Sequence, residues 1–172
     1  MRSFNLRQVK LRPGEEHREE IELELEPFEL GGERYLPVPG TLPALLAITK
    51  ATSGLVFDLR FTTRLHGPCY RCLGDAVLEV PVDAREYQAA SNPEGVEELR
   101  MAYLDEDNLD LGLGTWARDA IALELPDKIL CRPECAGLCP VCGKNLNDEP
   151  HEHTEETGDT RWSALESLRE QL

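Results

Sequence analysis

Eight cysteine and histidine side chains fall into four short-spaced pairs, and these residue types bind metal ions. The pairs are Cys69–Cys72, Cys131–Cys135, Cys139–Cys142 and His151–His153. Zinc in proteins takes four thiolate or imidazole ligands, and short-spaced pairs suit it because one tight turn can aim both side chains at one ion. No cysteine falls outside a pair. The pattern therefore predicts one or two zinc ions per chain, bound by these eight residues.

The four pairs are expected to combine into two tetrahedral sites. Cys139–Cys142 joins His151–His153, because this set spans only fifteen residues and closing so short a loop costs little entropy. Cys69–Cys72 then joins Cys131–Cys135 and links two distant segments. With four protein ligands each, both sites would be closed, which is the structural rather than the catalytic type of zinc site.

Other interpretations of these residues stay open. A C-x-x-C pair can instead be redox-active, but such a pair opens a helix after a strand, whereas Pro140 and Gly143 favour a tight turn. Histidines in an acidic segment, such as the His151–His153 pair, are often merely solvated. His17 and His66 stand alone and are expected to be ordinary surface or packing residues. No serine–histidine–aspartate arrangement or phosphate-binding glycine loop is present, so we expect no catalytic residue.

The elements that must position these ligands are strands and helices. Alternating apolar and polar residues predict strands at 15–27, 45–52, 55–65 and 76–87. Helices are expected at 114–125, with Thr115 as N-cap, and at 159–172. Polar or Gly- and Pro-rich stretches predict turns or loops at 31–40, 89–98 and 145–158. The expected fold class is therefore α+β: an antiparallel β-sheet with a packed amphipathic helix and a zinc-stabilised C-terminal segment.

Length and composition limit the number of domains and the location of the protein. A chain of 172 residues, 41% hydrophobic and 30% charged, can bury one core, so we expect a single domain over 1–172 with its zinc segment at 131–153. No stretch approaches the roughly 20 apolar residues of a membrane span, and the N-terminus lacks the apolar core of a secretory signal. These features predict a cytoplasmic protein without membrane contact, in which cysteines stay reduced.

The formal charge of −15 disfavours broad contact with nucleic-acid phosphates. Residues 83–127 hold twelve acids against three bases, whereas residues 1–14 hold four bases and no acid. An acidic surface can serve solubility alone, or it can attract a basic partner such as a ribosomal protein. Arg60, Arg64 and Arg71 lie near the first cysteine pair but are expected to belong to a solvated strand face.

Several segments of the chain carry a family resemblance. Residues 69–73 read C-Y-R-C-L, residues 123–126 read L-E-L-P, and residues 131–147 contain two cysteine pairs followed by N-L-N. With D-L-G at 110–112 and the ending at 159–165, this order resembles the YceD family, which is associated with accumulation of large-subunit ribosomal RNA. The resemblance covers most of the chain from about residue 45, and the first forty residues match only loosely.

The resemblance implies a function. It implies a non-enzymatic, zinc-binding factor in large-subunit rRNA accumulation or processing, whose partner is a pre-ribosomal particle, a basic ribosomal protein or a processing factor. Many similar proteins have C-x-C where this chain has His151-Glu152-His153, and imidazole preserves the ligand capacity. The alternatives are a zinc- or redox-responsive regulator, which needs an exposed labile pair, and a zinc hydrolase or nuclease, which needs an open metal position beside an acid.

Overall fold

The computed structural model describes residues 1–90 and 100–153. The chain divides into two compact units, Met1–Cys135 and Ala136–Leu172. Most of the loop expected at 89–98, and the helix expected at 159–172, lie outside the described residues.

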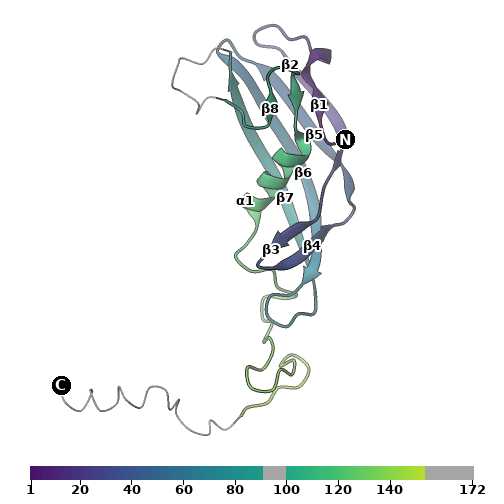
Figure 1. Ribbon diagram of the computed structural model, residues 1–172, viewed down its shortest axis with the longest axis vertical. Helices are drawn as coiled ribbons and strands as arrows, with labels where there is room; N and C mark the ends of the chain where they lie inside the picture. Colours follow the sequence, from purple (N-terminus) through teal and green to yellow (C-terminus); the bar gives the residue numbers. More distant parts are fainter. Residues whose placement is uncertain (91–99, 154–172) are drawn as a thin grey trace, which may run out of the picture. The chain divides into compact units, whose positions relative to one another are not determined.

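The first unit is built on a six-stranded antiparallel sheet (Figure 1). Its strands are β2 (Glu16–Glu24), β3 (Phe28–Leu30), β4 (Glu33–Pro37), β5 (Thr41–Lys50), β6 (Gly54–Pro68) and β7 (Asp75–Ala89). The order is β2-β5-β6-β4-β3, with β7 on the other side of β6. A second sheet joins β1 (Phe4–Asn5), β9 (Asp110–Leu111) and β8 (Leu104–Asp105), and a 3-10 turn, η1 (Leu6–Gln8), follows β1. The expected fold class, antiparallel sheet with one helix, is confirmed for the described residues.

Strands β6 and β7 form the longest ladder, which runs from Gly54 opposite Ala89 to Pro68 opposite Asp75. The predicted alternation in β6 holds, because Phe57, Leu59 and Leu65 are fully buried. The opposite face of the sheet is charged and carries cross-strand ion pairs. The two strands therefore form a firm hairpin whose tip is residues 69–74, the expected place of the first cysteine pair.

Helix α1 (Leu113–Glu124) packs on this sheet and contacts both β2 and β7. Its buried stripe is Leu113, Trp116, Ala117, Ala120 and Ile121, as the periodicity predicts. The prediction of Thr115 as N-cap is wrong, since Gly112 occupies that position without a side-chain cap. The first helical N–H groups are satisfied by backbone instead, because Gly114 donates to Arg2 O at 3.0 Å. A backbone contact with the N-terminal segment thus takes the place of a side-chain cap at the start of the helix.

The Gly- and Pro-rich stretch at 31–40 is not a simple turn, and here too the sequence expectation is corrected. Gly31 and Gly32, at φ of 62° and 84°, connect β3 and β4 as a two-residue hairpin loop. Two positive φ values suit the turn type that joins twisted antiparallel strands, and glycine adopts them without steric cost. Phe28 and Tyr35 anchor this hairpin in the core.

Candidate metal centres

The first knuckle, residues 69–74, is the tight turn that joins β6 to β7. The N–H of Cys69 donates to Gly74 O at 2.7 Å, and the N–H of Leu73 donates to Cys69 O at 2.9 Å. Leu73 has a φ of 60°, a left-handed conformation that is unusual for leucine. The turn directs Cys69 and Cys72 toward the same point, as their spacing predicts.

Strand β4 and the segment after α1 hold this knuckle in place. The Tyr35 hydroxyl donates to Pro68 O at 2.9 Å, and its ring lies where a Cβ on Gly67 would come within 2.3 Å. The N–H of Tyr70 donates to the carbonyl of buried Ile129 at 2.8 Å. Arg71 donates through Nη1 to Cys135 O at 2.8 Å. The turn is thereby tied to the segment that carries the second cysteine pair.

Four cysteines meet at this point, and we call them the first cluster: Cys69, Cys72, Cys131 and Cys135. The sulfurs of Cys69 and Cys135 are 3.8 Å apart, and those of Cys72 and Cys131 are 3.7 Å apart. Zinc–sulfur bonds of about 2.3 Å place tetrahedral ligands about 3.8 Å from each other. All four sulfurs lie within 4.8 Å of one another, so their separations fit one tetrahedral zinc ion.

The electrostatics of the first cluster also favour a cation. Burial raises the pKa of the Cys69 thiol, but backbone N–H groups of Cys72, Cys131 and Arg71 outweigh it and lower that pKa to about 6. Burial and the neighbouring thiols raise the pKa of Cys131 to about 12. One thiolate is therefore stabilised by the knuckle, while further ionisation is opposed by like charge. A divalent cation removes this opposition, because it attracts every thiolate in the cluster.

The second knuckle, residues 139–144, repeats the first in its backbone. The N–H of Cys139 donates to Lys144 O at 2.8 Å, and the N–H of Gly143 donates to Cys139 O at 2.9 Å. Gly143, with a φ of 73°, occupies the position that Leu73 has in the first knuckle. A β-bridge between Leu138 and Asn145 closes the turn. Identical hydrogen bonds at identical offsets show that the two C-x-x-C segments form the same type of turn.

The second cluster consists of Cys139, Cys142, His151 and His153, whose ligand atoms also lie within 4.8 Å of one another. His151 Nε2 lies 3.1 Å from Cys142 Sγ, while its Nδ1 lies 2.7 Å from Glu149 O. A carbonyl can only accept, so Nδ1 carries the proton and Nε2 is left available to a metal. The two imidazole rings meet edge to face with centroids 5.0 Å apart.

The pKa values in the second cluster follow the same pattern. Backbone N–H groups, first that of Cys142, lower the pKa of Cys139 to about 6 against a smaller opposing effect of burial. The hydrogen bond to Glu149 O, followed by the contact with Cys139, raises the pKa of His151. Cys139 is buried, whereas Cys142 and His153 are exposed. This donor set also fits zinc, in a more open setting than the first.

The two asparagines of the N-L-N stretch, Asn145 and Asn147, hold the second cluster together. Asn145 Oδ1 accepts from the N–H of Asn147 at 3.0 Å, and Asn147 Oδ1 accepts from the N–H of Ala136 at 2.9 Å. The N–H of Leu146 donates to Gly137 O at 2.9 Å. Asparagine side chains commonly close such turns, so the N-x-N that follows the second knuckle was the available signal.

The eight predicted residues therefore form two groups with the expected memberships, while metal binding by them stays a prediction. Arg71 was expected on a solvated strand face, but it lies in the first knuckle and donates to Cys135 O, whereas Arg60, Arg64 and His17 lie on the surface as expected. Arg60 and Arg64 are engaged with Asp83 and Glu79, at 2.9 and 3.3 Å, on the charged sheet face. His17 lies 3.0 Å from Glu19.

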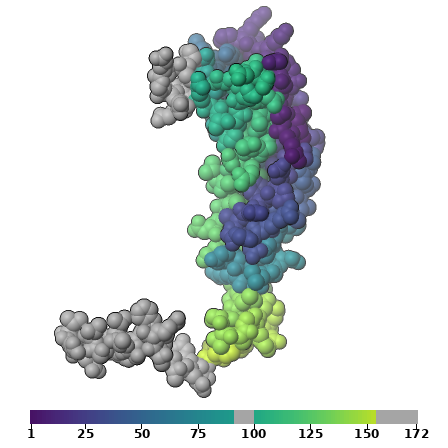
Figure 2. All heavy atoms as spheres, viewed as in Figure 1, coloured from purple at the N-terminus to yellow at the C-terminus, as the bar shows by residue number. Residues whose placement is uncertain are grey.

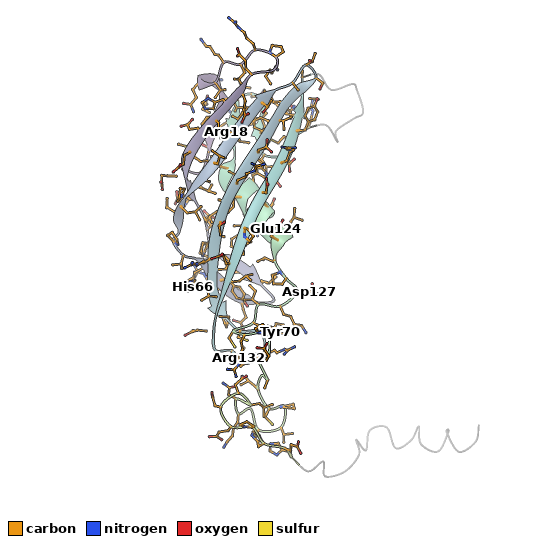
Figure 3. The ribbon with its side chains drawn as sticks, turned by 180° about the vertical axis from the view of Figure 1, so that it is seen from behind. Arg18, His66, Tyr70, Glu124, Asp127 and Arg132 are labelled. Carbon is orange, nitrogen blue, oxygen red and sulfur yellow. The ribbon has the colours of Figure 1, made fainter. Side chains whose placement is uncertain are left out.

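Figure 3 shows His66, Tyr70 and Arg132 at the end of the first unit where β6 enters the knuckle. No helix among the described residues is long and apolar enough to cross a membrane.

Comparisons with known proteins agree with these observations. The family model described as "Large ribosomal RNA subunit accumulation protein YceD" matches residues 57–169. An uncharacterized protein of Mycobacterium tuberculosis is 38% identical over 123 residues, which are 70% of this chain and 58% of that protein. One of Mycobacterium leprae is 30% identical over 103 residues, 58% of this chain and 46% of its own length. The matches thus span about half the length of these relatives. No solved structure matches the chain significantly.

Proposed function

This chain belongs to the YceD family, and on that premise we propose that it is a non-enzymatic, zinc-binding factor that supports accumulation or processing of large-subunit ribosomal RNA during ribosome biogenesis. The observation that carries the proposal is the family match over residues 57–169, which includes both cysteine clusters. The match also spans parts of both compact units, so we propose that they act as one YceD domain.

The proposed role of zinc is structural. We assign Cys69, Cys72, Cys131 and Cys135 to one ion, and Cys139, Cys142, His151 and His153 to another. Each set supplies four protein ligands, which leaves no coordination position for a reacting water and so disfavours hydrolysis. The cation would hold the β6–β7 tip against the segment after α1, and would close the loop of the second unit. Reduced cysteines of this kind suit the cytoplasm.

The proposed partner is a basic protein of the pre-ribosomal particle rather than bare rRNA. Several arginines are already paired with acids in the first unit: Arg2 with Glu24 and Glu26, Arg18 with Glu16, Arg60 with Asp83, Arg64 with Glu79 and Arg85 with Asp58. Direct contact with phosphates requires clustered cations, and this pairing reduces their number. The net charge of −15 instead favours a cationic partner.

The acidic turn at 105–110 offers a test of that partner, but only two of its four acids are suitable. Asp105 accepts from the N–H groups of Asp107 and Asn108 at 3.0 and 3.2 Å, so replacing it would disturb the turn. Glu106 accepts from Gln88 Nε2 at 2.9 Å. Asp107 and Asp110 can therefore be neutralised at a lower structural cost than Asp105 and Glu106. Asp107→Asn with Asp110→Asn should weaken binding to a basic ribosomal protein and leave the melting temperature nearly unchanged.

The function itself is tested in cells that lack the gene for this chain. We expect less mature large-subunit rRNA and fewer large subunits on a sucrose gradient, with small-subunit rRNA unaffected. The wild-type chain should restore the profile, and it should co-sediment with large-subunit precursors. Unchanged rRNA and subunit profiles after deletion would refute the proposal.

A further inference from the structure

A groove runs between strand β7 and helix α1 in the first unit, and its lining includes no cysteine. Its volume is about 220 Å³, and its lining includes Glu86, Tyr103, Trp116, Ala120, Leu123 and Glu124. This volume is below the range of about 300–1,000 Å³ that is usual for small-molecule sites. The groove is therefore suited to side chains of a polypeptide rather than to a cofactor. Figure 2 shows the α1 segment, in green, on this face of the molecule.

Part of the apolar surface of the groove is exposed to solvent. Leu123 is 87% exposed, the largest value among the exposed large hydrophobic residues of the described chain. Ala120 and Trp116 lie on the same helix and are buried. An apolar side chain laid against Leu123 would remove its surface from water, which is the usual driving force of association.

The polar part of the groove is acidic, and the arginine in its lining is engaged elsewhere. Among the described residues, the Glu86 carboxylate has no hydrogen-bond or ion-pair partner, although it is only partly exposed. Burial raises its pKa, because the charged form is poorly solvated there. Glu124 adds negative charge along the same wall (Figure 3), whereas the Asp83 carboxylate of the lining is paired with Arg60 at 2.9 Å. Arg85, the basic residue of the lining, is held by Asp58 at 2.7 Å.

Strand β7 also presents an open edge. Among the described residues it pairs with β6 alone. An extended peptide can add to such an edge through backbone hydrogen bonds, while its alternate side chains enter neighbouring pockets. Pro81 lacks an N–H and limits this to the part of β7 that follows it, which is the part that lines the groove.

We propose that the β7–α1 groove binds an extended, lysine- or arginine-bearing segment of a partner protein, with one cationic side chain on Glu86 and an apolar side chain against Leu123. The inference rests on the proposed function in that it identifies where the basic partner binds. Charge complementarity selects this occupant: an acidic segment would add repulsion beside Glu86 and Glu124, and a nucleic-acid backbone would do the same.

The test uses the full chain and two labelled peptides of about seven residues, the length of an ordinary strand. In one, lysine and valine occupy alternate positions with threonine between them, and the other has glutamate in place of lysine. We expect fluorescence anisotropy to show binding of the lysine peptide only, with an affinity that falls as salt rises. Glu86→Gln should weaken binding about tenfold and Leu123→Ser severalfold, because each removes one of the two anchors.

Matched controls come from the same strand. Glu79 is an exposed carboxylate of β7 that pairs with Arg64 outside the groove, and Val77 is a 53% exposed apolar residue of β7. Glu79→Gln and Val77→Ser should bind the peptide like the wild type. Equal binding by Glu86→Gln and the wild type, or equal binding of the glutamate peptide, would overturn the proposal.

Stability provides a second readout that a merely structural role would not give. A raised folded pKa means that ionised Glu86 lowers stability once the pH exceeds the ordinary pKa of a glutamate carboxyl group. Among the other charged or titratable residues of the lining, Asp83 and Arg85 are engaged in ion pairs with Arg60 and Asp58, and Tyr103 and Glu124 carry no positive charge. Glu86→Gln should therefore melt higher at neutral pH, with the gain vanishing as the pH falls below the ordinary carboxyl range. A variant that binds worse and melts lower would indicate a structural role instead and overturn the proposal.

The groove proposal and the proposed function are refuted by different results. If deletion of the gene reduces large-subunit rRNA and the Glu86→Gln, Leu123→Ser double variant restores it fully, the groove proposal is overturned and the function stands. If deletion leaves rRNA unchanged, the function is overturned, and specific binding of the lysine peptide still supports the groove.

Discussion

The two cysteine clusters share one backbone turn but differ in what surrounds it. In the first cluster the knuckle is the tip of the β6–β7 hairpin, tied to β4 by Tyr35 and to the segment after α1 by Tyr70 and Arg71. In the second, all four side chains come from fifteen consecutive residues, 139–153, and the loop is closed by Asn145 and Asn147. The same turn therefore joins distant segments of the chain in the first cluster and closes a local loop in the second.

This difference has an energetic consequence. A metal ion that joins residues 69–72 to residues 131–135 closes a long loop, so it removes much conformational entropy from the unfolded chain. The second site closes a short loop and removes less. The first cluster also buries Cys69 and Cys135 almost completely, at 0% and 1% exposure. We therefore expect the stability of the first unit to depend on its cluster, and the second cluster to exchange metal more readily.

The largest expected effect comes from removing one ligand of each cluster. Cys72→Ser should lower the melting temperature by roughly 10 °C or more, since it uncouples the sheet tip from the segment after α1 and loses metal-linked stability of about 3 kcal/mol. His153→Ala should cost less than about 1 kcal/mol, because its ligand loop is local and exposed. Thermal denaturation followed by circular dichroism measures both. His17→Ala serves as a control, and equal losses from the two ligand variants would contradict the comparison.

Metal exchange should separate the clusters next. A chelator added to the purified protein should remove the second ion first, with the thiols of Cys139 and Cys142 becoming reactive together. The first ion should leave later, because two of its four sulfurs are buried. Mass spectrometry of alkylated peptides at successive times identifies which cysteines react. Simultaneous release, or earlier reaction of Cys69 and Cys135, would show that burial does not control exchange.

A smaller effect is expected where the sheet supports the first knuckle. Gly67→Ala places a methyl group 2.3 Å from the Tyr35 ring, so the ring or the strand end must shift, at a cost of about 1–3 kcal/mol. Denaturant unfolding measures this, and metal loss from the first cluster should accompany it. Gly40→Ala is the matched control, since its Cβ meets nothing within 4 Å. Equal stability of the two alanine variants would mean that this contact does not support the turn.

The smallest expected change in stability comes from the residue with positive φ that occupies the same position in each knuckle, Leu73 in the first and Gly143 in the second. Leu73→Gly should stabilise the protein slightly, by up to about 1 kcal/mol, because it relieves a positive φ and loses little burial from a side chain that is 59% exposed. Gly143→Ala should destabilise the second unit by about 1 kcal/mol for the converse reason. Opposite signs are the prediction, and unfolding curves of both variants test it. A loss of stability in Leu73→Gly would instead indicate that the Leu73 side chain has a packing role.

The ligand sets and the main strands were predictable because they leave local signals. The alternation from Leu55 to Leu65 identifies β6, and the C-x-x-C spacing identifies both knuckles. The β3–β4 hairpin was missed because its strands are short and Gly31-Gly32 looked like part of a longer turn. The N-cap of α1 was predicted wrongly because the N–H of Gly114 donates to distant backbone, Arg2 O, and no side chain caps the helix. Contacts such as Tyr35 with Gly67 depend on tertiary packing, and no sequence pattern carries them.

Metal content of the purified chain and of one variant from each cluster tests the central claim most directly. We predict two zinc ions per wild-type chain, prepared without added metal, and one after either Cys69→Ser with Cys72→Ser or Cys139→Ser with Cys142→Ser. Elemental analysis with a parallel thiol titration gives the answer. Less than half an equivalent of zinc in the wild type, with all six cysteines titrating as free thiols, would contradict the account.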